Sequence, residues 1–381
     1  MILIQNAKIL PMTSPDIERG DILMDGGKLK AIGIGLKAPE GCQTVDATGL
    51  WALPGFVDAH CHLGMWEDGI GFEGADGNEA TDPVTPQLRA IDAINPVDPC
   101  FKEAREAGVT TACTGPGSAN VLGGQFIALK TFGVRVDDMI VKQPLAMKAA
   151  LGENPKRVYD GQKKSPSTRM ATAAVFREAL VAAQEYKRKL GGEHAPDRNL
   201  KMEILVDVLE RRLPIKIHAH RADDILTAIR IAKEFSLDYS VEHCTEGYMI
   251  PEILKAENVK VIVGPLLSER SKFELKNLTY TAPLVLHEAG IKFALMTDHP
   301  VIPLQYLPVT AALAVREGLD ERTALKAITI HAAEITGIAD RVGSLEPGKD
   351  ADVALFDGNP LDYRVKARMV FINGQEVYRR K

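Results

Sequence analysis

The chain has 381 residues, of which 45% are hydrophobic, and a formal net charge of −5 at pH 7. This length suits one large α/β barrel with a small accessory domain, and the apolar share is enough for a sizeable core. The composition excludes two kinds of partner: no basic block favours nucleic acid, and no apolar run of about eighteen residues favours a membrane span. The five cysteines lack Cys-x-x-Cys spacing and the N-terminus lacks a signal-peptide pattern, so we expect a cytoplasmic protein.

Short strands separated by turns open the chain and close it. Residues 2–9, 20–24 and 28–34 alternate like strands, with a turn at Asp25-Gly26-Gly27. The last forty residues return to this pattern, with strands expected over 353–356 and 370–373. We therefore predict that residues 1–52 and 341–381 together form a composite β domain, built as a small β-sandwich.

Residues 53–340 alternate apolar strands with helical stretches, which predicts a parallel sheet. One helix is expected over 169–189, where apolar residues recur at helical spacing. Eight strands can be counted, the first ending at His60 and His62 and the others covering 109–114, 125–130, 139–151, 214–220, 239–243, 259–263 and 291–298. The count predicts a (β/α)₈ TIM barrel over residues 53–340.

Histidine and aspartate side chains stand at the ends of four of these strands. Side chains of a strand alternate between faces, so His60 and His62 point the same way and can chelate one ion. The full set is His60 and His62 on the first strand, His218 and His220 on the fifth, His243 on the sixth and Asp298 on the eighth. Barrels of this kind carry their chemistry at the carboxyl ends of the strands, so the set predicts a metal site.

The chain resembles the amidohydrolase superfamily of metal-dependent barrel hydrolases, and in particular its imidazolonepropionase- and prolidase-like members. The resemblance covers nearly the whole length and rests on residues 54–62, His218, His243, 297–298 and 348–352. It implies that His60, His62 and Asp298 hold the more buried metal ion. It also implies that His218 and His243 hold a second ion, or that His243 takes a polar role in a one-metal site.

A ligand that bridges the two ions would come from the fourth strand. In relatives this group is a carboxylated lysine or a glutamate, and one-metal members lack it. Lys148, Lys142 and Glu153 are available here, and burial beside metal ions favours a lysine carbamate because it lowers the lysine pKa. Of these three residues, we expect Glu153 to be the bridging ligand, with Lys148 as the second candidate and Lys142 as the third.

Several other polar residues are candidates for the barrel mouth. His220 shares the face of His218, and since relatives use the first histidine of this strand as ligand, we expect His220 to contact substrate or transfer protons. Arg221 and Arg270 are candidates for binding a substrate carboxylate. His194 and His287 are expected to be surface histidines.

The ligand set suits zinc, with one or two ions. A bound ion lowers the pKa of its water from about 16 towards 7, and Asp298 and His243 are the expected proton-handling groups. The predicted reaction is hydrolysis of an amide-like C–N bond in a small substrate, with cyclic and anionic compounds as the candidate classes. A metal-dependent deaminase is the alternative, and a non-catalytic scaffold of the same fold is a third interpretation. We expect a small-molecule substrate and association into a homo-oligomer.

Overall fold

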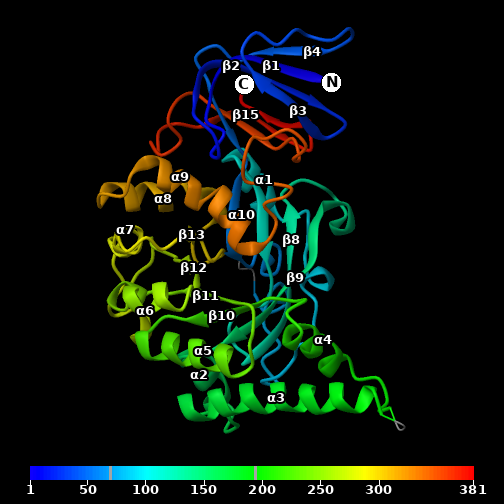
Figure 1. Ribbon diagram of the computed structural model, residues 1–381, viewed down its shortest axis with the longest axis vertical. Helices are drawn as coiled ribbons and strands as arrows, with labels where there is room; N and C mark the ends of the chain where they lie inside the picture. The colour runs from blue at the N-terminus through cyan, green and yellow to red at the C-terminus, as the bar shows by residue number, and fades with distance from the viewer. Residues whose placement is uncertain (68–70, 193–194) are drawn as a thin grey trace.

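The computed structural model describes residues 1–67, 71–192 and 195–381 and divides its strands between two eight-stranded sheets (Figure 1). One sheet lies at one end of the long axis, and the other runs through the middle of the molecule with helices packed around it. Among the described residues, no helix is both long enough and apolar enough to cross a membrane.

Strands from both ends of the chain form the first sheet, and the two termini lie in it (Figure 1). Its order is β16-β15-β14-β5-β1-β2-β3, with β4 paired to β1. The core of this sheet mixes the two ends, because Ile4 and Ile22 pack in one cluster with Val353 and Phe371. The prediction of a composite β domain is thus supported in part, although hydrogen bonds join all eight strands into one sheet. The strands are β1 (Ile2–Ile9), β2 (Ile17–Asp25), β3 (Lys28–Gly33), β4 (Gln43–Asp46), β5 (Trp51–Pro54), β14 (Val353–Phe356), β15 (Ala367–Ile372) and β16 (Gln375–Arg379).

The second sheet follows chain order and curls into a nearly closed barrel, consistent with the TIM-type architecture. Backbone hydrogen bonds join its first strand to the segment after its last: the Asp298 N–H donates to the His60 carbonyl (3.2 Å), and the His62 N–H donates to the His299 carbonyl (2.8 Å). The strands are β6 (Phe56–Cys61), β7 (Val109–Thr114), β8 (Leu122–Lys130), β9 (Ile140–Ala150), β10 (Ile215–Ala219), β11 (Tyr239–His243), β12 (Lys260–Val263) and β13 (Phe293–Leu295).

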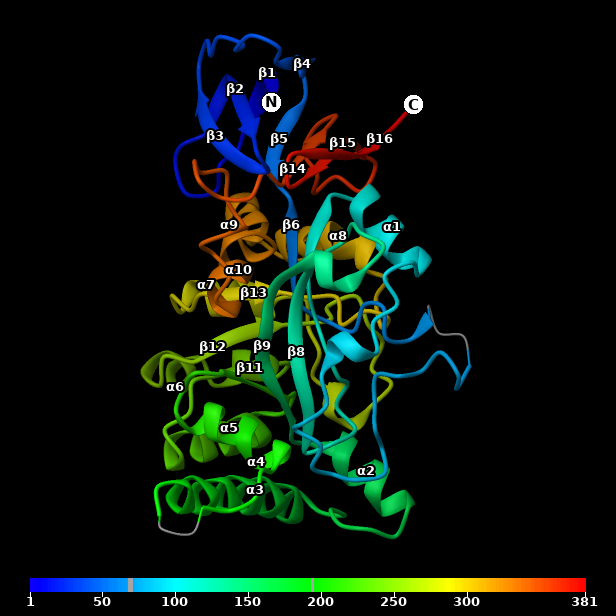
Figure 2. The ribbon, with the colours of Figure 1, turned by 90° about the vertical axis from the view of Figure 1, so that its right-hand side faces the viewer.

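One strand of the barrel runs against the prediction of a parallel sheet. β8 pairs antiparallel with β7 and with β9, while every other pair in this sheet is parallel. Parallel neighbours need a crossover of about a dozen residues or more, but residues 115–121 provide only a short return from β7 to β8. The long strands β8 and β9 run side by side along the vertical axis in Figure 2.

Helices cover the outside of the barrel, with α5 and α6 beside β11 and β12 in Figure 2. The helix predicted over 169–189 is α3, whose N-terminus is capped by the Thr168 side chain accepting from the Ala171 N–H (3.0 Å). Its buried face includes Phe176 and Leu180. The helices are α1 (Pro99–Glu106), α2 (Glu153–Gly161), α3 (Arg169–Leu190), α4 (Leu200–Leu209), α5 (Ala222–Glu234), α6 (Pro251–Ala256), α7 (Ala282–Glu288), α8 (Leu307–Arg316), α9 (Glu321–Ala327) and α10 (Ile330–Thr336).

Candidate metal centre

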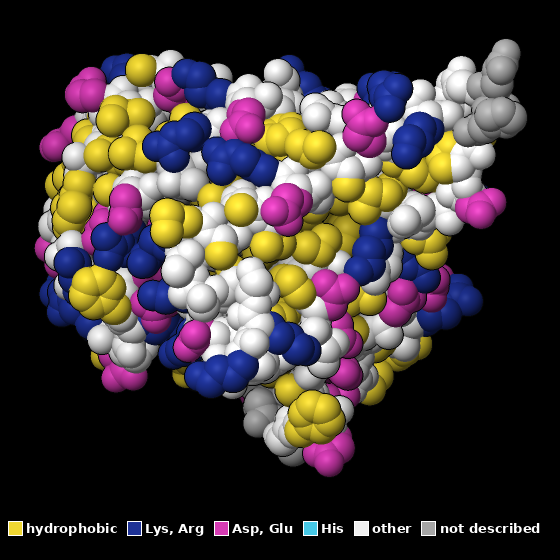
Figure 3. Space-filling model, turned by 90° about the horizontal axis from the view of Figure 1, so that it is seen from below, with side chains coloured by type: hydrophobic (Ala, Val, Ile, Leu, Met, Phe, Trp, Pro, Cys, Tyr) yellow, Lys and Arg dark blue, Asp and Glu magenta, His cyan; other side chains and the backbone are white. Residues whose placement is uncertain are grey.

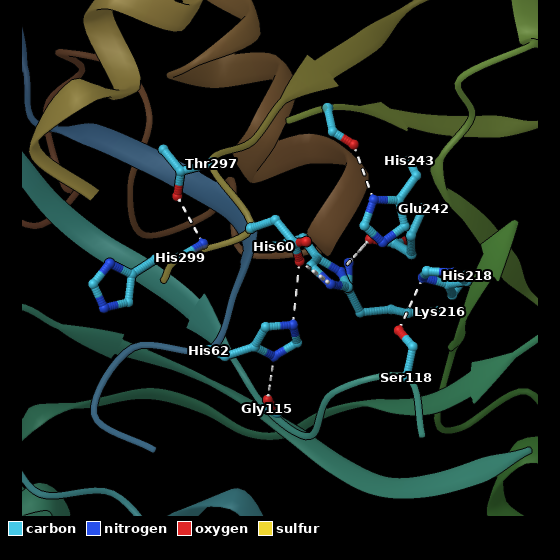
Figure 4. A network of polar contacts seen from close by, with 12 residues as sticks. His60, His62, Gly115, Ser118, Lys216, His218, Glu242, His243, Thr297 and His299 are labelled. Atoms are coloured by element: carbon cyan, nitrogen blue, oxygen red, sulfur yellow. Dashed lines mark hydrogen bonds and ion pairs between the residues drawn. The ribbon is translucent and has the colours of Figure 1, made fainter. Parts of the chain in front are cut away.

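Imidazole rings from three barrel strands converge at the C-terminal mouth of the barrel. Figure 4 shows His60 and His62 from the end of β6 facing His218 from β10 and His243 from β11. These rings are at least nine-tenths buried. None of them reaches the face shown in Figure 3, where Lys and Arg side chains mix with Asp and Glu and no histidine of the described residues is visible.

The first group of converging atoms contains His60, His243 and Asp298, whose ligand atoms lie within 4.8 Å of one another, and His62 approaches it through Asp298. One Asp298 carboxylate oxygen, Oδ1, lies 3.6 Å from Nε2 of His60 and 3.2 Å from Nε2 of His62. Asp298 follows β13 with a left-handed φ of 55°. This φ is unusual for a residue other than glycine and is often found at functional sites.

The second group contains His218, His220 and His243. One ligand atom of each lies within 4.8 Å of the others. His220 was expected from the sequence to contact substrate or transfer protons, but its ring lies among the candidate ligands. Glu274 also reaches this group, with Oε1 3.5 Å from Nε2 of His218 and 3.6 Å from Nε2 of His220. Nothing in the sequence pattern singled out Glu274, which lies in the loop between β12 and α7.

Each of these histidines uses Nδ1 for a contact away from the centre, which leaves Nε2 facing it. The Nδ1 partners are the Glu242 carboxylate for His60 (2.7 Å), the Gly115 carbonyl for His62 (2.6 Å), the Ser118 hydroxyl for His218 (2.8 Å), the Thr245 hydroxyl for His220 (2.7 Å) and the Gly264 carbonyl for His243 (2.9 Å). Second partners of this kind fix the tautomer and orientation of metal-binding histidines.

Burial favours the neutral form of four of these imidazoles. It lowers the pKa of His60, His218, His220 and His243 well below the ordinary value, and nearby cationic groups add to the effect. A neutral imidazole with Nδ1–H tied to an acceptor presents a lone pair on Nε2. That lone pair is what a metal ligand needs.

Glu242 organises the base of the centre and was not singled out by the sequence analysis. Its carboxylate is fully buried and contacts Nδ1 of His60, Nζ of Lys216 (2.9 Å) and the Ser240 hydroxyl. Lys216 also donates to the Ala59 carbonyl (3.2 Å). Strand alternation puts Ser240 and Glu242 on the inner face of β11, and this pattern could have indicated from the sequence that Glu242 lies inside the barrel.

Of the three candidates for a bridging ligand, the structure brings Lys148 to the centre. Lys148 is fully buried on β9, with Nζ 3.3 Å from Nε2 of His60, and burial lowers its pKa to about 8. Glu153, preferred from the sequence, instead accepts a hydrogen bond from the Glu274 backbone N–H (3.1 Å). Lys142 donates to the Gly337 carbonyl (3.1 Å) at the opposite end of β9. α2 begins at Glu153 and its first turn directs that side chain to the Glu274 loop, so Lys148 is the best placed of the three and the bridging ligand stays a prediction.

Arg221 and Arg270 make local contacts. The Arg221 guanidinium forms a bidentate pair with Asp223 (2.8 Å for each bond), and Arg270 donates to the Leu278 carbonyl (2.7 Å). A substrate role for either arginine stays a prediction. His287 is a surface residue on α7, as expected, and His194 lies outside the described residues.

The described residues fit a divalent metal ion. Several buried atoms that face the centre have no hydrogen-bond partner among them: Nε2 of His218, His220 and His243, Oε1 of Glu274 and Oδ1 of Asp298. Zinc–nitrogen and zinc–oxygen bonds of about 2.0–2.1 Å place two ligands of a tetrahedral ion about 3.4 Å apart. The 3.2–3.6 Å separations between Asp298 or Glu274 and the histidines match this spacing.

Comparisons with known proteins agree with this geometry. Residues 51–377 match the model of the amidohydrolase family. A crystal structure of an amidohydrolase from Thermotoga maritima MSB8 is 46% identical, covers 100% of both chains and superposes with a TM-score of 0.97. Amidohydrolase tasK of Hapsidospora irregularis is 28% identical over 93% of this chain, and an adenine deaminase of Bacillus velezensis is 25% identical over 99% of it. The chain spans 39% and 58% of the lengths of these two relatives.

Proposed function

Because this chain belongs to the amidohydrolase family of hydrolases acting on carbon–nitrogen bonds, we propose that it is a metal-dependent hydrolase of an amide-like C–N bond in a small substrate. One observation carries this proposal. Imidazole nitrogens and carboxylate oxygens from strand ends and loops of the barrel meet in a buried centre where they have no hydrogen-bond partner among the described residues. Such an arrangement of unpaired polar atoms is costly unless a cation binds there.

His60, His62 and Asp298 would hold one ion, and His218, His220 and His243 a second. Zinc, when bound, supplies a Lewis acid and lowers the pKa of coordinated water from about 16 to about 7. Asp298 would accept the proton of the attacking water and pass it to the leaving nitrogen. The Nδ1 contacts of the histidines hold the rings in place during this transfer. Lys148, if its neutral amine adds CO2 and loses a proton to give a carbamate, would supply further oxygen ligands at the centre.

Deamination is the second candidate, since adenine deaminase is among the relatives that match nearly the whole chain. The same ligands would then act on an amidine-like carbon and release ammonia. The two reactions are distinguished by product when the substrates are chosen accordingly: an ammonia-coupled assay responds to deamination, whereas hydrolysis of an N-substituted amide releases an amine and a carboxylate. The scaffold interpretation requires loss of ligands, and all six histidine and aspartate candidates are present.

Zinc as the native ion, a cytoplasmic location and a homo-oligomeric state belong to this proposal as well. They rest on the donor set, on the scattered cysteines and on the sequence resemblance, respectively. A small-molecule substrate fits the depth at which the histidines are buried, and Arg221 and Arg270 remain candidates for binding its anionic part.

The first test is the metal content per chain, measured by elemental analysis on protein purified without added metal. About two divalent ions support the bridged centre, and about one ion supports a single-metal enzyme. A His60→Ala/His62→Ala variant should lose metal, while His287→Ala, which changes an exposed histidine on α7, should retain it. A wild-type protein that takes up neither zinc nor manganese on reconstitution contradicts the proposed function.

A further inference from the structure

Glu274 places a carboxylate in the centre from outside the barrel strands. It lies in the one-turn helix Phe273–Leu275, within the loop between β12 and α7, and its side chain is fully buried. Its Oε1 faces Nε2 of His218 and His220 at 3.5 and 3.6 Å and has no hydrogen-bond partner among the described residues. A buried carboxylate oxygen without a donor carries a large desolvation penalty, so this position calls for a positive charge.

Resting on the proposed function, we infer that Glu274 is a ligand of the second metal ion, together with His218 and His220. Nε2 of each of these histidines also has no hydrogen-bond partner among the described residues, so three buried polar atoms lie together without a partner. The distances from Oε1 to both Nε2 atoms match the separation of about 3.4 Å between ligands of one tetrahedral zinc ion. A loop carboxylate thus adds an oxygen ligand beside the histidine nitrogens of this group.

A reciprocal contact holds Glu274 in this orientation. The Glu153 backbone N–H donates to Oε2 of Glu274 (3.1 Å), and the Glu274 backbone N–H donates to Oε2 of Glu153 (3.1 Å). This pair fixes Oε2 and turns Oε1 towards the histidines. Glu153 is therefore a positioning residue, one step removed from the metal.

Gly152 leaves the space for this carboxylate. Its φ is +85°, a conformation that favours glycine, and a Cβ at this position would lie 2.7 Å from Oε2 of Glu274. The start of α2 is thus shaped to receive a side chain from a loop more than a hundred residues away. This close approach distinguishes a built site from a carboxylate that is buried by chance.

The experiment compares wild type with Glu274→Gln, Glu153→Ala and the control Glu269→Gln, which alters an exposed glutamate of the same loop. Metal stoichiometry is measured by elemental analysis, metal Kd by chelator competition, and ligand identity by the electronic absorption spectrum of the cobalt-substituted protein. Glu274→Gln should weaken binding of one ion by more than 100-fold and change the cobalt spectrum. Glu153→Ala should weaken it by roughly 10–100-fold, as expected for a group that orients a ligand. Glu269→Gln should match wild type.

Wild-type stoichiometry, Kd and cobalt spectrum in Glu274→Gln would overturn the inference, and a change confined to the KM of an amine-bearing substrate would reassign Glu274 to substrate binding. If Glu274→Gln does not fold, Glu274→Asp decides, because it keeps the charge but draws the carboxylate back from His218 and His220, and unchanged metal affinity in that variant also overturns the inference. Failure of the proposed function gives a different result. In that case, wild type itself binds no metal.

Discussion

Two candidate ligands sit in backbone conformations that strand geometry alone would not produce. His243 and Asp298 have φ values of 71° and 55°, in the left-handed region. Each such residue costs about 1–3 kcal/mol and persists only where the surrounding structure enforces it. At the end of β11, simple alternation would put His243 on the face opposite Glu242, and the left-handed turn instead brings its ring to the barrel mouth. At His243 and Asp298, a strained backbone conformation therefore occurs together with a side chain that is directed to the metal centre.

Replacing Asp298 with asparagine should remove the proton acceptor while keeping the size of the side chain. We expect kcat to fall by about 10²–10⁴-fold, the usual contribution of a positioned acid–base group. The thermal unfolding midpoint of the apo protein should change little, because Oδ1 has no hydrogen-bond partner among the described residues. Asp340→Asn, at an exposed position, is the control. Wild-type kcat in the Asp298→Asn variant would remove this residue from the mechanism.

Glu242→Gln tests whether the contact behind His60 matters for metal binding. The amide can no longer offer two carboxylate oxygens to His60, Lys216 and Ser240, so the His60 ring loses its fixed tautomer. Metal affinity should fall by about 10–100-fold, as is typical when an outer partner of a ligating histidine is changed. The measurement is metal Kd by chelator competition. An unchanged Kd would mean that β6 alone orients His60.

The positions of the barrel strands could be predicted from the sequence, but the direction of one strand could not. All eight barrel strands lie close to their predicted positions because each is a short apolar run bounded by turns. The antiparallel direction of β8 was not predicted, because the periodicity of a strand carries no information on its direction. The role of Glu274 was not predicted for a related reason. Its side chain is held by a contact with Glu153, 121 residues away in the chain, and no local sequence pattern indicates such a contact. His60, His62, His218 and His243 could be found because each ends a recognisable strand.

The junction between the two sheets depends on a glycine. Gly55 links β5 to β6, and a Cβ there would lie 2.1 Å from Oγ1 and 2.6 Å from Cβ of Thr110, a buried residue of β7. Gly55→Ala should therefore destabilise the protein by about 1–3 kcal/mol through overpacking.

A double-mutant cycle with Thr110→Ala checks the cause of this loss. That change removes the two nearest atoms of the threonine but keeps its Cβ, so the double variant should recover part of the lost free energy of unfolding, measured in urea. Purely additive effects of the two substitutions would show that this close approach is not what limits residue 55.

In the whole molecule, a buried ionic network joins the two sheets. Lys130, at the end of β8, contacts Asp350 (3.0 Å) and Asp352 (2.6 Å) just before β14. Asp350 also pairs with Lys28 of β3 (2.7 Å) and with Arg341 (2.8 Å). Because Lys130 and both aspartates are almost fully buried, removing one partner leaves an uncompensated charge between the sheets.

Asp350→Asn should cost about 3–5 kcal/mol in the free energy of unfolding at pH 7, the range for breaking a buried ion pair. The effect should depend on pH with a definite sign. Burial alone would raise the pKa of Asp350, but the charge of Lys130 and the hydrogen bonds from Lys28, Lys130 and Arg341 outweigh it and leave the pKa below its ordinary value. The carboxylate therefore contributes fully above its unfolded pKa of about 3.9, and its contribution declines as the pH falls below that value.

Urea unfolding of wild type and Asp350→Asn between pH 7 and pH 3 measures this dependence, and the difference between them should shrink towards the acid end. Asp137→Asn, at an exposed site before β9, should stay within about 0.5 kcal/mol of wild type throughout. A difference that is independent of pH would mean that Asp350 stabilises the junction through packing rather than through its charge. A difference that grows towards acid pH would mean that its carboxyl group is protonated in the native protein and that Lys130 is compensated by Asp352 alone.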